Sequence, residues 1–273
     1  MKKLPIIAAV AGLAVVGGLS ASAQSLMVQL QASNYNPTTG VWNDSVNSSF
    51  FGYAYAEGYG TGLNPTLTAG ATPNGSAAVN FSPSHAGDFS LYNDTATTGA
   101  GISAANGYTI FAVIEPGAGS SPQALTGGWG NGCLEYRING GSQDVLSEWT
   151  KDYASGTGTV PSTGFSIADV TVSSAGGTFY LNGVADGTIG ANAGFNDAIR
   201  NLFNNAGGGE GFSGMVAEID IYSGTMTAGQ MAAEDSALTA EYITTVPEPS
   251  TWVMMASGFG MLLVTRRFRR NQG

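Results

Sequence analysis

The stretch GMVAEIDIY, residues 214–222, predicts the last strand of a β-sheet. Successive side chains of a strand point to opposite faces, so this stretch separates into two sets of residues. One set is apolar and is expected to face the core: Met215, Ala217, Ile219 and Ile221. The other set is mostly polar: Val216, Glu218, Asp220 and Tyr222. We therefore expect Glu218 and Asp220 to lie in solvent on the polar face of the strand.

A short helix is expected directly after this strand. Thr227-Ala228-Gly229-Gln230 has the pattern of a capping box, with Thr227 at the N-cap position and Gln230 three residues later. Met231, Leu238 and Tyr242 then recur at helical spacing and form one stripe. The sequence therefore predicts one C-terminal helix that packs through this stripe.

Earlier segments predict short strands joined by tight turns. Residues with high strand propensity gather in 26–31, 77–81, 88–92, 108–115, 134–138, 145–149 and 178–181. Turns are indicated by Asn139-Gly140, Gly176-Gly177, Asn182-Gly183 and Asp186-Gly187. Residues 34–44, which include Trp42, and residues 60–76 are expected to be loops. Because no helices alternate with these strands, the pattern predicts an all-β sandwich of antiparallel sheets.

The apolar alternation changes phase within residues 165–172. Phe165 and Ile167 form one alternating pair, and Val170 and Val172 form another. We interpret the change at Ala168-Asp169 as a bulge or bend in the strand.

The composition argues against nucleic acid as a partner. The chain has 41 Gly and few Lys or Glu, which suits strands and turns better than helices. Of its 19 acidic residues, 18 precede Pro247. The basic residues between Gln24 and Val246 are only Arg137, Lys151 and Arg200. Such an acidic body repels phosphate backbones.

The chain has one cysteine, Cys133, and one histidine, His85. No disulfide can form within the chain, and we expect Cys133 to be a small core residue and His85 a loop residue. The sequence offers no zinc ligand set and no Gly-x-Ser-x-Gly motif for a serine nucleophile. No metal or cofactor is assigned, although the acidic body could hold divalent cations, and calcium is left open without a specific site.

Three features follow one another at the C-terminus. Val246-Pro247-Glu248-Pro249 is an extended segment, because the prolines fix φ. Residues 251–265 are uncharged and apolar, but as a helix of about 22 Å they are short for a membrane span. An arginine cluster expected to stay in the cytoplasm follows: Arg266, Arg267, Arg269 and Arg270.

This order of features resembles the PEP-CTERM sorting signal of Gram-negative bacteria. The resemblance implies recognition by a membrane-embedded exosortase, with the helix in the membrane before processing. A plain C-terminal membrane anchor without processing is the alternative.

The N-terminus has the pattern of a secretory signal peptide. Lys2 and Lys3 precede the apolar residues 4–19, and Ala21-Ser22-Ala23 is a small-x-small cleavage site. A short N-terminal membrane helix is the alternative. The chain is thus expected to comprise a signal peptide at 1–23, a β-sandwich domain at 24–245 and a sorting signal at 246–270. Together the signals imply export, a transient stay in the inner membrane, and delivery to the cell surface or a biofilm matrix.

Several blocks of the body resemble the LamG-like, concanavalin A-like lectin/glucanase superfamily. The most specific block is 212–242, which holds a Gly-rich turn, the AEIDIY strand and the C-terminal helix. Residues 32–44, 108–115 and 179–183 are similar to its opening, central strand and hairpin. The resemblance implies a jelly roll of two antiparallel sheets, in which the first and last strands are adjacent.

Laminarinase-type glycoside hydrolases of this superfamily carry Glu-x-Asp-x-Glu on one strand. Glu218 and Asp220 match its first two positions, but the third is Tyr222, or Ser223 in the bulged form. Neither is a proton donor near neutral pH, since an unperturbed tyrosine titrates near pH 10. No catalytic residue is therefore assigned, and a divergent hydrolase stays an alternative.

Two non-catalytic functions remain: a glycan-binding surface or matrix protein, and a structural or adhesive one. The candidate glycan contacts are Tyr53, Tyr55, Trp129 and Trp149. Tyr53 and Tyr55 would share one face of a strand within residues 50–59. They would form either an exposed stacking platform or part of the core, and the sequence leaves both open.

Overall fold

The computed structural model describes residues 24–46, 50–54, 64–81, 88–91, 102, 106–117, 122–127, 135–139, 143–148, 151–191, 199, 201–203, 211–245 and 257. In these ranges no helix combines the length and the apolar character that crossing a membrane requires.

The first of two sheets, sheet A, has eight strands among the described residues. They are β1 (Leu26–Gln31), β5 (Thr66–Thr68), β6 (Ala78–Phe81), β8 (Tyr108–Pro116), β13 (Ser166–Ser173), β14 (Gly176–Leu181), β15 (Val184–Ile189) and β17 (Gly214–Ser223). Their order is β15-β14-β13-β8-β17-β6-β5, and β1 also pairs with β17.

Sheet B has nine strands among the described residues. They are β2 (Tyr35–Asn36), β3 (Val41–Asn43), β4 (Phe50–Ala54), β7 (Asp88–Leu91), β9 (Pro122–Gly127), β10 (Glu135–Asn139), β11 (Gln143–Glu148), β12 (Lys151–Ser155) and β16 (Asn201–Leu202). Their order is β12-β11-β10-β9-β16-β7-β4-β3-β2.

The expected antiparallel jelly roll is confirmed in this part of the chain. Each described strand pairing is antiparallel, and β1 lies beside β17, so the first and last strands are neighbours. β17 lies inside sheet A: β8 pairs along one side, whereas β6 and β1 pair with successive halves of the other. The last strand therefore joins segments that are far apart in the sequence.

The main core lies between the two sheets. Sheet A contributes inward side chains such as Leu30, Ile110 and Ile219, and sheet B contributes Leu125 and Ile138. Each of these side chains is fully buried. Apolar burial of this extent is the main favourable term in folding, at about 25 cal/mol per Å².

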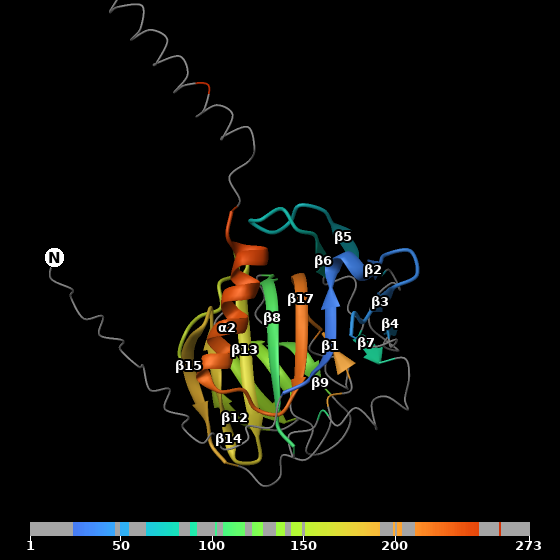
Figure 1. Ribbon diagram of the computed structural model, residues 1–273. Coiled ribbons are helices and arrows are strands. Elements are labelled where there is room, and N and C mark those ends of the chain that lie inside the picture. The colour runs from blue at the N-terminus through green and yellow to red at the C-terminus, as the bar shows by residue number, and fades with distance from the viewer. Residues whose placement is uncertain are drawn as a thin grey trace, which may run out of the picture.

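A helix covers the other face of sheet A, which makes the domain three layers thick (Figure 1). Helix α2 (Ala228–Leu238) continues into a π-helical turn, η3 (Thr239–Ile243). The expected stripe is confirmed, since Met231, Leu238 and Tyr242 are buried and belong to a second apolar cluster beneath the helix. A short 3-10 helix, η1 (Ala32–Asn34), follows β1.

The predicted capping box at the start of α2 is also confirmed. The backbone N–H of Gln230 donates to Thr227 Oγ1 at 3.4 Å, and the backbone N–H of Thr227 donates to Gln230 Oε1 at 2.9 Å. Two of the backbone N–H groups at this end are thereby satisfied by side chains.

Two expected loops contain strands. Residues 34–44 include β2 and β3, and Trp42 on β3 is fully buried, with its indole N–H donating to the carbonyl of Gln31 at 2.7 Å. Residues 60–76 include β5. These three strands are only two or three residues long, too short to produce a periodic signal.

The expected bulge at Ala168-Asp169 is wrong. β13 pairs without a register shift with β8 and with β14. Ala168 belongs to the main core, together with Val170 and Val172, whereas Phe165 and Ile167 belong to the cluster beneath α2. The apparent change of phase arises because both faces of this strand are buried.

The expected turn at Asp186-Gly187 is also wrong, because both residues lie within β15. Asp186 is the extra residue of a bulge against β14. Its carboxylate accepts hydrogen bonds from Thr157 and from the backbone N–H of Gly158, just after β12. Asp186 thereby links an edge strand of sheet A to the segment that follows an edge strand of sheet B.

Candidate functional site

Helix α2 covers a layer of carboxyl side chains on the outer face of sheet A. Its members are Glu218 and Asp220 on β17, Asp169 on β13, and Asp235 on α2. Their exposed fractions are 1%, 1%, 0% and 4%. The expectation that Glu218 and Asp220 lie in solvent is therefore wrong, because the helix covers the polar face of the strand.

A β-bulge in β17 decides which residues face the helix. Val216 pairs with Ile114 of β8, and Glu218 pairs with the adjacent Val113, so Ala217 is the extra residue. Val216 accordingly belongs to the main core, and Ala217 to the cluster beneath α2. Met215 also packs against the cluster beneath α2. The expected sides of Met215, Val216 and Ala217 are thus reversed, because the bulge shifts the alternation by one residue.

Glu218 is held by three hydrogen-bond donors that come from two elements, β1 and η3. The Tyr242 hydroxyl of η3 donates to Oε2. The side-chain amide of Gln29 on β1 donates to Oε1 at 2.8 Å, and that of Gln31 donates to Oε2 at 3.4 Å. These bonds connect the first strand, the last strand and the helix through one buried carboxyl group.

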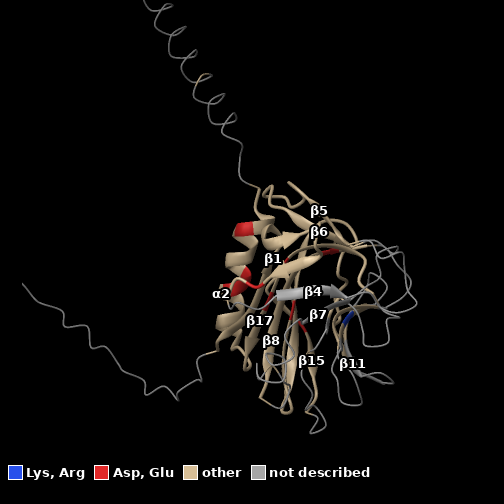
Figure 2. Cartoon of the chain, turned by 90° about the vertical axis from the view of Figure 1, so that its right-hand side faces the viewer, with Lys and Arg blue, Asp and Glu red and all other residues tan. Residues whose placement is uncertain are grey.

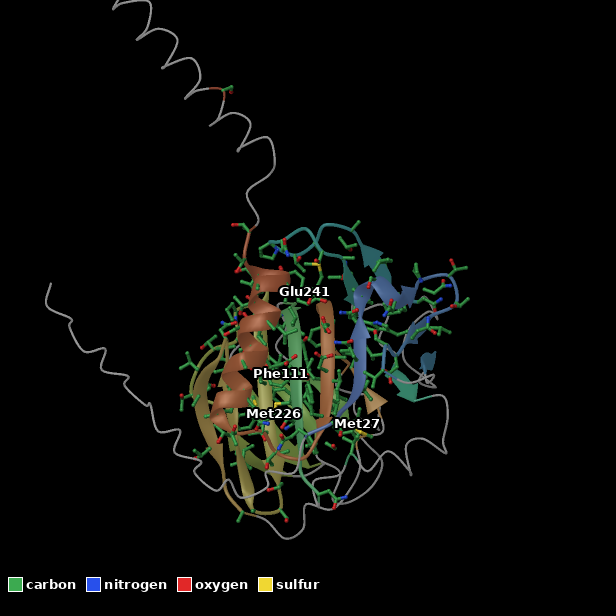
Figure 3. The ribbon with its side chains drawn as sticks, in the orientation of Figure 1. Met27, Phe111, Met226 and Glu241 are labelled. Atoms are coloured by element: carbon green, nitrogen blue, oxygen red, sulfur yellow. The ribbon has the colours of Figure 1, made fainter. Side chains whose placement is uncertain are left out.

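Asp220 lies in a row of residues that crosses the sheet. Gln29 of β1 and Phe111 of β8 pair with it on either side, and Asp169 of β13 pairs with Phe111 on the far side. Phe111 thus lies between the two aspartates, on the face that α2 covers (Figure 3). Among the described residues, neither oxygen of Asp220 has a hydrogen bond of good geometry, although the side chains of Glu218 and Gln29 lie close to it.

Asp235 reaches this layer from the helix. It belongs to the buried stripe, since it follows Met231 by four residues and precedes Leu238 by three. Its carboxyl group lies beside the β14–β15 turn, where a Cβ atom added to Gly183 would be 3.4 Å from Oδ2. Gly183 has a φ of +76°, so both its backbone and the nearby carboxyl group favour glycine there.

Burial dominates the titration of these groups. Together with the neighbouring Glu218, it raises the pKa of Asp220 to about 9. Burial also raises the pKa of Glu218, although the hydrogen bond from Tyr242 works in the opposite direction. It raises the pKa of Asp235, and the adjacent Asp169 carboxyl group, which can share a proton with it, offsets part of that effect. Ionised carboxylates are therefore disfavoured beneath the helix.

The elements that enclose Glu218, Asp220 and Asp235 contain no cationic residue. β1, β8, β13, β14, β17, α2 and η3 have no Lys, Arg or His. Figure 2 shows acidic segments on α2 and on strands beside it, without a basic segment among them. Because buried charges are normally paired, this environment favours the protonated form of the three carboxyl groups.

The arrangement can share protons and hold the helix, but a polymeric substrate has no access while the helix is docked. The third position of the hydrolase motif, Tyr222, is half-buried, and its ring packs edge-on against Phe111 at 5.9 Å. Burial raises its pKa far above the neutral range. In the ranges that the structure covers, no three Asp, Glu, Cys or His side chains are grouped as metal ligands.

Most of the residues singled out from the sequence lie outside the described ones. This applies to the signal peptide at 1–23, the sorting signal at 246–270 except Ser257, with its motif and arginines, Cys133, His85, Tyr55, Trp129 and Trp149. Tyr53 lies on β4, where its backbone pairs with Phe89 of β7.

Sequence reasoning missed Asp169, Asp235 and the bond from Tyr242 to Glu218. A signal was present for Asp235, because it falls on the same helical stripe as Met231, Leu238 and Tyr242. Asp169 had a weaker signal: it lies two residues after Ile167, and therefore on the same face of β13.

Comparison with protein families agrees with this architecture. The model described as concanavalin A-like lectin/glucanases superfamily matches residues 90–232, just over half of the chain. The chain belongs to this superfamily. The superfamily match is narrower than the expected resemblance, which extended back towards Gln24. A second model, the PEP-CTERM protein-sorting motif, matches residues 245–270 and confirms the C-terminal resemblance.

One solved structure shares this fold over most of the chain. Domain 4 of AbnA, an extracellular GH43 arabinanase from Geobacillus stearothermophilus in complex with arabinotriose, has a TM-score of 0.52 and 17% identity over 77% of this chain and 98% of that one. This likeness supports the fold alone. No curated protein sequence matches this chain.

Two further structures overlap less well. A CBM40 from the Ruminococcus gnavus IT-sialidase, bound to α2,3-sialyllactose, has a TM-score of 0.46 and 11% identity over 62% of this chain and 98% of that one. A Trypanosoma rangeli sialidase has a TM-score of 0.48 and 16% identity over 77% of this chain, and only 32% of the sialidase is covered.

Proposed function

We propose that this chain is an exported, non-catalytic surface or matrix protein whose β-sandwich binds a glycan. The observation that carries the proposal is the burial of Glu218 and Asp220, each 1% exposed, beneath a helix in a protein of a lectin/glucanase superfamily. In this proposal, the two residues that match the hydrolase motif hold the helix and do not act on a substrate. Glycan binding is then the function of the β-sandwich.

The sorting motif supplies the location in this proposal. Residues 1–23 act as a signal peptide, 24–245 form the sandwich, and 246–270 are recognised by an exosortase at Pro247-Glu248-Pro249. Residues 251–265 hold the protein in the inner membrane until processing, while the arginines from Arg266 to Arg270 stay in the cytoplasm. The product is delivered to the cell surface or to an extracellular matrix.

Sheet B is the side we propose for glycan binding. Helix α2 occupies the outer face of sheet A (Figure 1). By contrast, Tyr53 lies on β4, Trp129 lies in the chain between β9 and β10, and Trp149 directly follows β11, all strands of sheet B. Tyr55 follows β4 by one residue. Aromatic rings stack on sugar rings, and the arabinanase domain of the same fold was captured with arabinotriose.

A glycan array tests this proposal. The full chain, purified in a mild detergent, is expected to bind at least one family of polysaccharides. A Trp129→Ala/Trp149→Ala double variant should lose at least tenfold in affinity. Val184→Ala, at an exposed position of sheet A (69% exposed), is the matched control and should bind like the parent. No binding to any glycan, with and without calcium, would support the structural or adhesive alternative instead.

The divergent-hydrolase alternative has its own test. The full chain is expected to release no more reducing sugar from β-glucans than its Glu218→Gln variant does. Release above that variant would require Glu218 to meet substrate, and would overturn the non-catalytic function.

A further inference from the structure

The helix that covers the carboxyl layer is fastened at both ends. The capping box fixes its first turn, and Gln230 also donates to the side chain of Gln24 at 2.6 Å. At the other end, the backbone N–H of Asn74 donates to the carbonyl of Tyr242 at 3.3 Å, and the Asn74 side chain donates to the carbonyl of Glu241. Figure 3 shows Glu241 at the end of the helix from which the chain leaves the domain. We refer to residues 228–243 as the latch.

The middle of the latch rests on a surface that is both apolar and acidic. The titratable side chains that meet here are Glu234 and Asp235 of α2, Glu241 and Tyr242 of η3, Glu218, Asp220 and Tyr222 of β17, Asp169 of β13 and Tyr180 of β14. β1 and β8 present Gln29, Gln31, Phe111 and Val113 at this face. None of these groups can carry a positive charge, so the described residues at this face offer no cation that could neutralise a carboxylate.

We propose that the latch is pH-sensitive: it docks on sheet A while the buried carboxyl groups hold protons, and it is released as they ionise. Docking removes Glu218, Asp220 and Asp235 from water, and only Glu218 receives hydrogen bonds from several donors. Release returns all of them to solvent, where ionised carboxylates are stable.

The direction of the pH dependence follows from linkage. Burial holds the pKa of Asp220 near 9 when the latch is docked, and it raises the pKa of Glu218 and Asp235 as well. The docked state therefore binds protons more tightly than the released state, in which carboxyl groups titrate near pH 4. Docking is complete below about pH 4 and weakens as the pH rises towards 9.

Release would change the reach of the chain that follows. With the latch docked, only Thr244 and Thr245 separate it from the segment that begins at Val246. With the latch released, residues 225–245 become an extended linker between the folded domain and this segment, and the linker can span up to about 70 Å. In the proposed function this segment is the sorting motif, so the latch would set how far the folded body sits from the membrane. Only this consequence depends on the proposed function; docking itself does not.

Hydrogen exchange of the full chain in detergent micelles tests the latch. Peptides from 228–243 are followed by mass spectrometry at pH 5.5, 7 and 8.5, after correction for the intrinsic pH dependence of exchange. Their protection should fall at least tenfold from pH 5.5 to 8.5, while peptides from β8 stay protected. The Glu218→Gln/Asp220→Asn variant carries neutral groups of similar shape, so its latch should keep its protection at pH 8.5.

Three further variants make the result decisive. Glu115→Gln removes a partly exposed carboxyl group of β8 that is not one of the buried ones, and it should keep the parent's pH dependence. If the double variant does not fold, Asp220→Asn and Asp235→Asn are examined singly, and each should flatten the pH dependence. Equal latch protection of the parent at pH 5.5 and 8.5 would overturn the proposal, and so would an unchanged pH dependence in the variants. Glycan binding is not measured, so failure here leaves the proposed function standing.

Discussion

Trp42 shows how a single side chain connects distant parts of the core. Its ring stacks on Phe203 at 5.7 Å and tilts against Tyr35 at 5.6 Å, and its N–H bonds the carbonyl of Gln31. Trp42→Ala would leave a large cavity at a fully buried site, so we expect it to cost about 3–5 kcal/mol in free energy of unfolding. Urea denaturation followed by fluorescence measures this loss. Leu67→Ala, at a partly exposed position of β5 (38% exposed), should change the value by less than about 0.5 kcal/mol.

Asp220 gives a second prediction at the residue scale. Because burial raises its pKa to about 9, the folded chain binds a proton at this site that the unfolded chain releases near pH 4. Its stabilising contribution is therefore present at low pH and is lost as the pH rises from about 4 towards 9. The free energy of unfolding should fall over this range, by at most about 1.4 kcal/mol per pH unit for each such proton. Asp220→Asn should have a shallower slope in urea titrations at pH 5, 7 and 9; parallel slopes would contradict the assignment.

At the scale of elements, helix α2 depends on its first turn. Thr227→Ala removes one partner of the capping box and leaves the Gln230 N–H without its side-chain acceptor. We expect a loss of about 1 kcal/mol in thermal or urea unfolding, with faster hydrogen exchange in the first turn of α2. Ser236→Ala lies on the same helix, is exposed, and removes only a bond to the carbonyl of Ala232, so it should have little effect.

The elements that could be predicted from sequence were those with a strong local signal. β1, β8, β17 and α2 have alternating or helical apolar patterns, and the capping box specified the start of the helix. What failed was the assignment of faces. A strand face covered by a helix and one covered by water can both carry Asp and Glu, so Glu218 and Asp220 gave no sign of their burial. The bulge at Ala217 could not be seen either, because alanine fits both faces.

The candidate site illustrates the same limit. Glu218 and Asp220 were identified from their strand, but their partners come from β1, β13, α2 and η3. Only the tertiary fold brings Gln29 and Tyr242 to the same carboxyl group. Asp235 was the one local clue to the buried site, because it is a polar residue inside an apolar helical stripe.

For the whole molecule, the sorting motif gives a direct prediction. From a host that contains an exosortase, mass spectrometry of the mature protein should find a C-terminus near Pro249, and from a host without one it should find Gly273. Pro247→Ala should leave the tail uncut. Pro161→Ala, which changes an exposed proline of the sandwich domain, is the control and should be cut like the parent. An intact Gly273 in the inner membrane of both hosts would favour a simple anchor.

The position of β17 has a consequence for the order in which the molecule can be completed. The strand that fills the interior of sheet A is also its last strand in the sequence, so a nascent chain lacks it until residue 223 has emerged from the ribosome. Until then β8 has no partner on one side, and β1 and β6 have nothing to join them. The sandwich therefore cannot fold completely while the chain is still being synthesised. A translocation channel that admits only unfolded polypeptide could take up the chain before folding is complete.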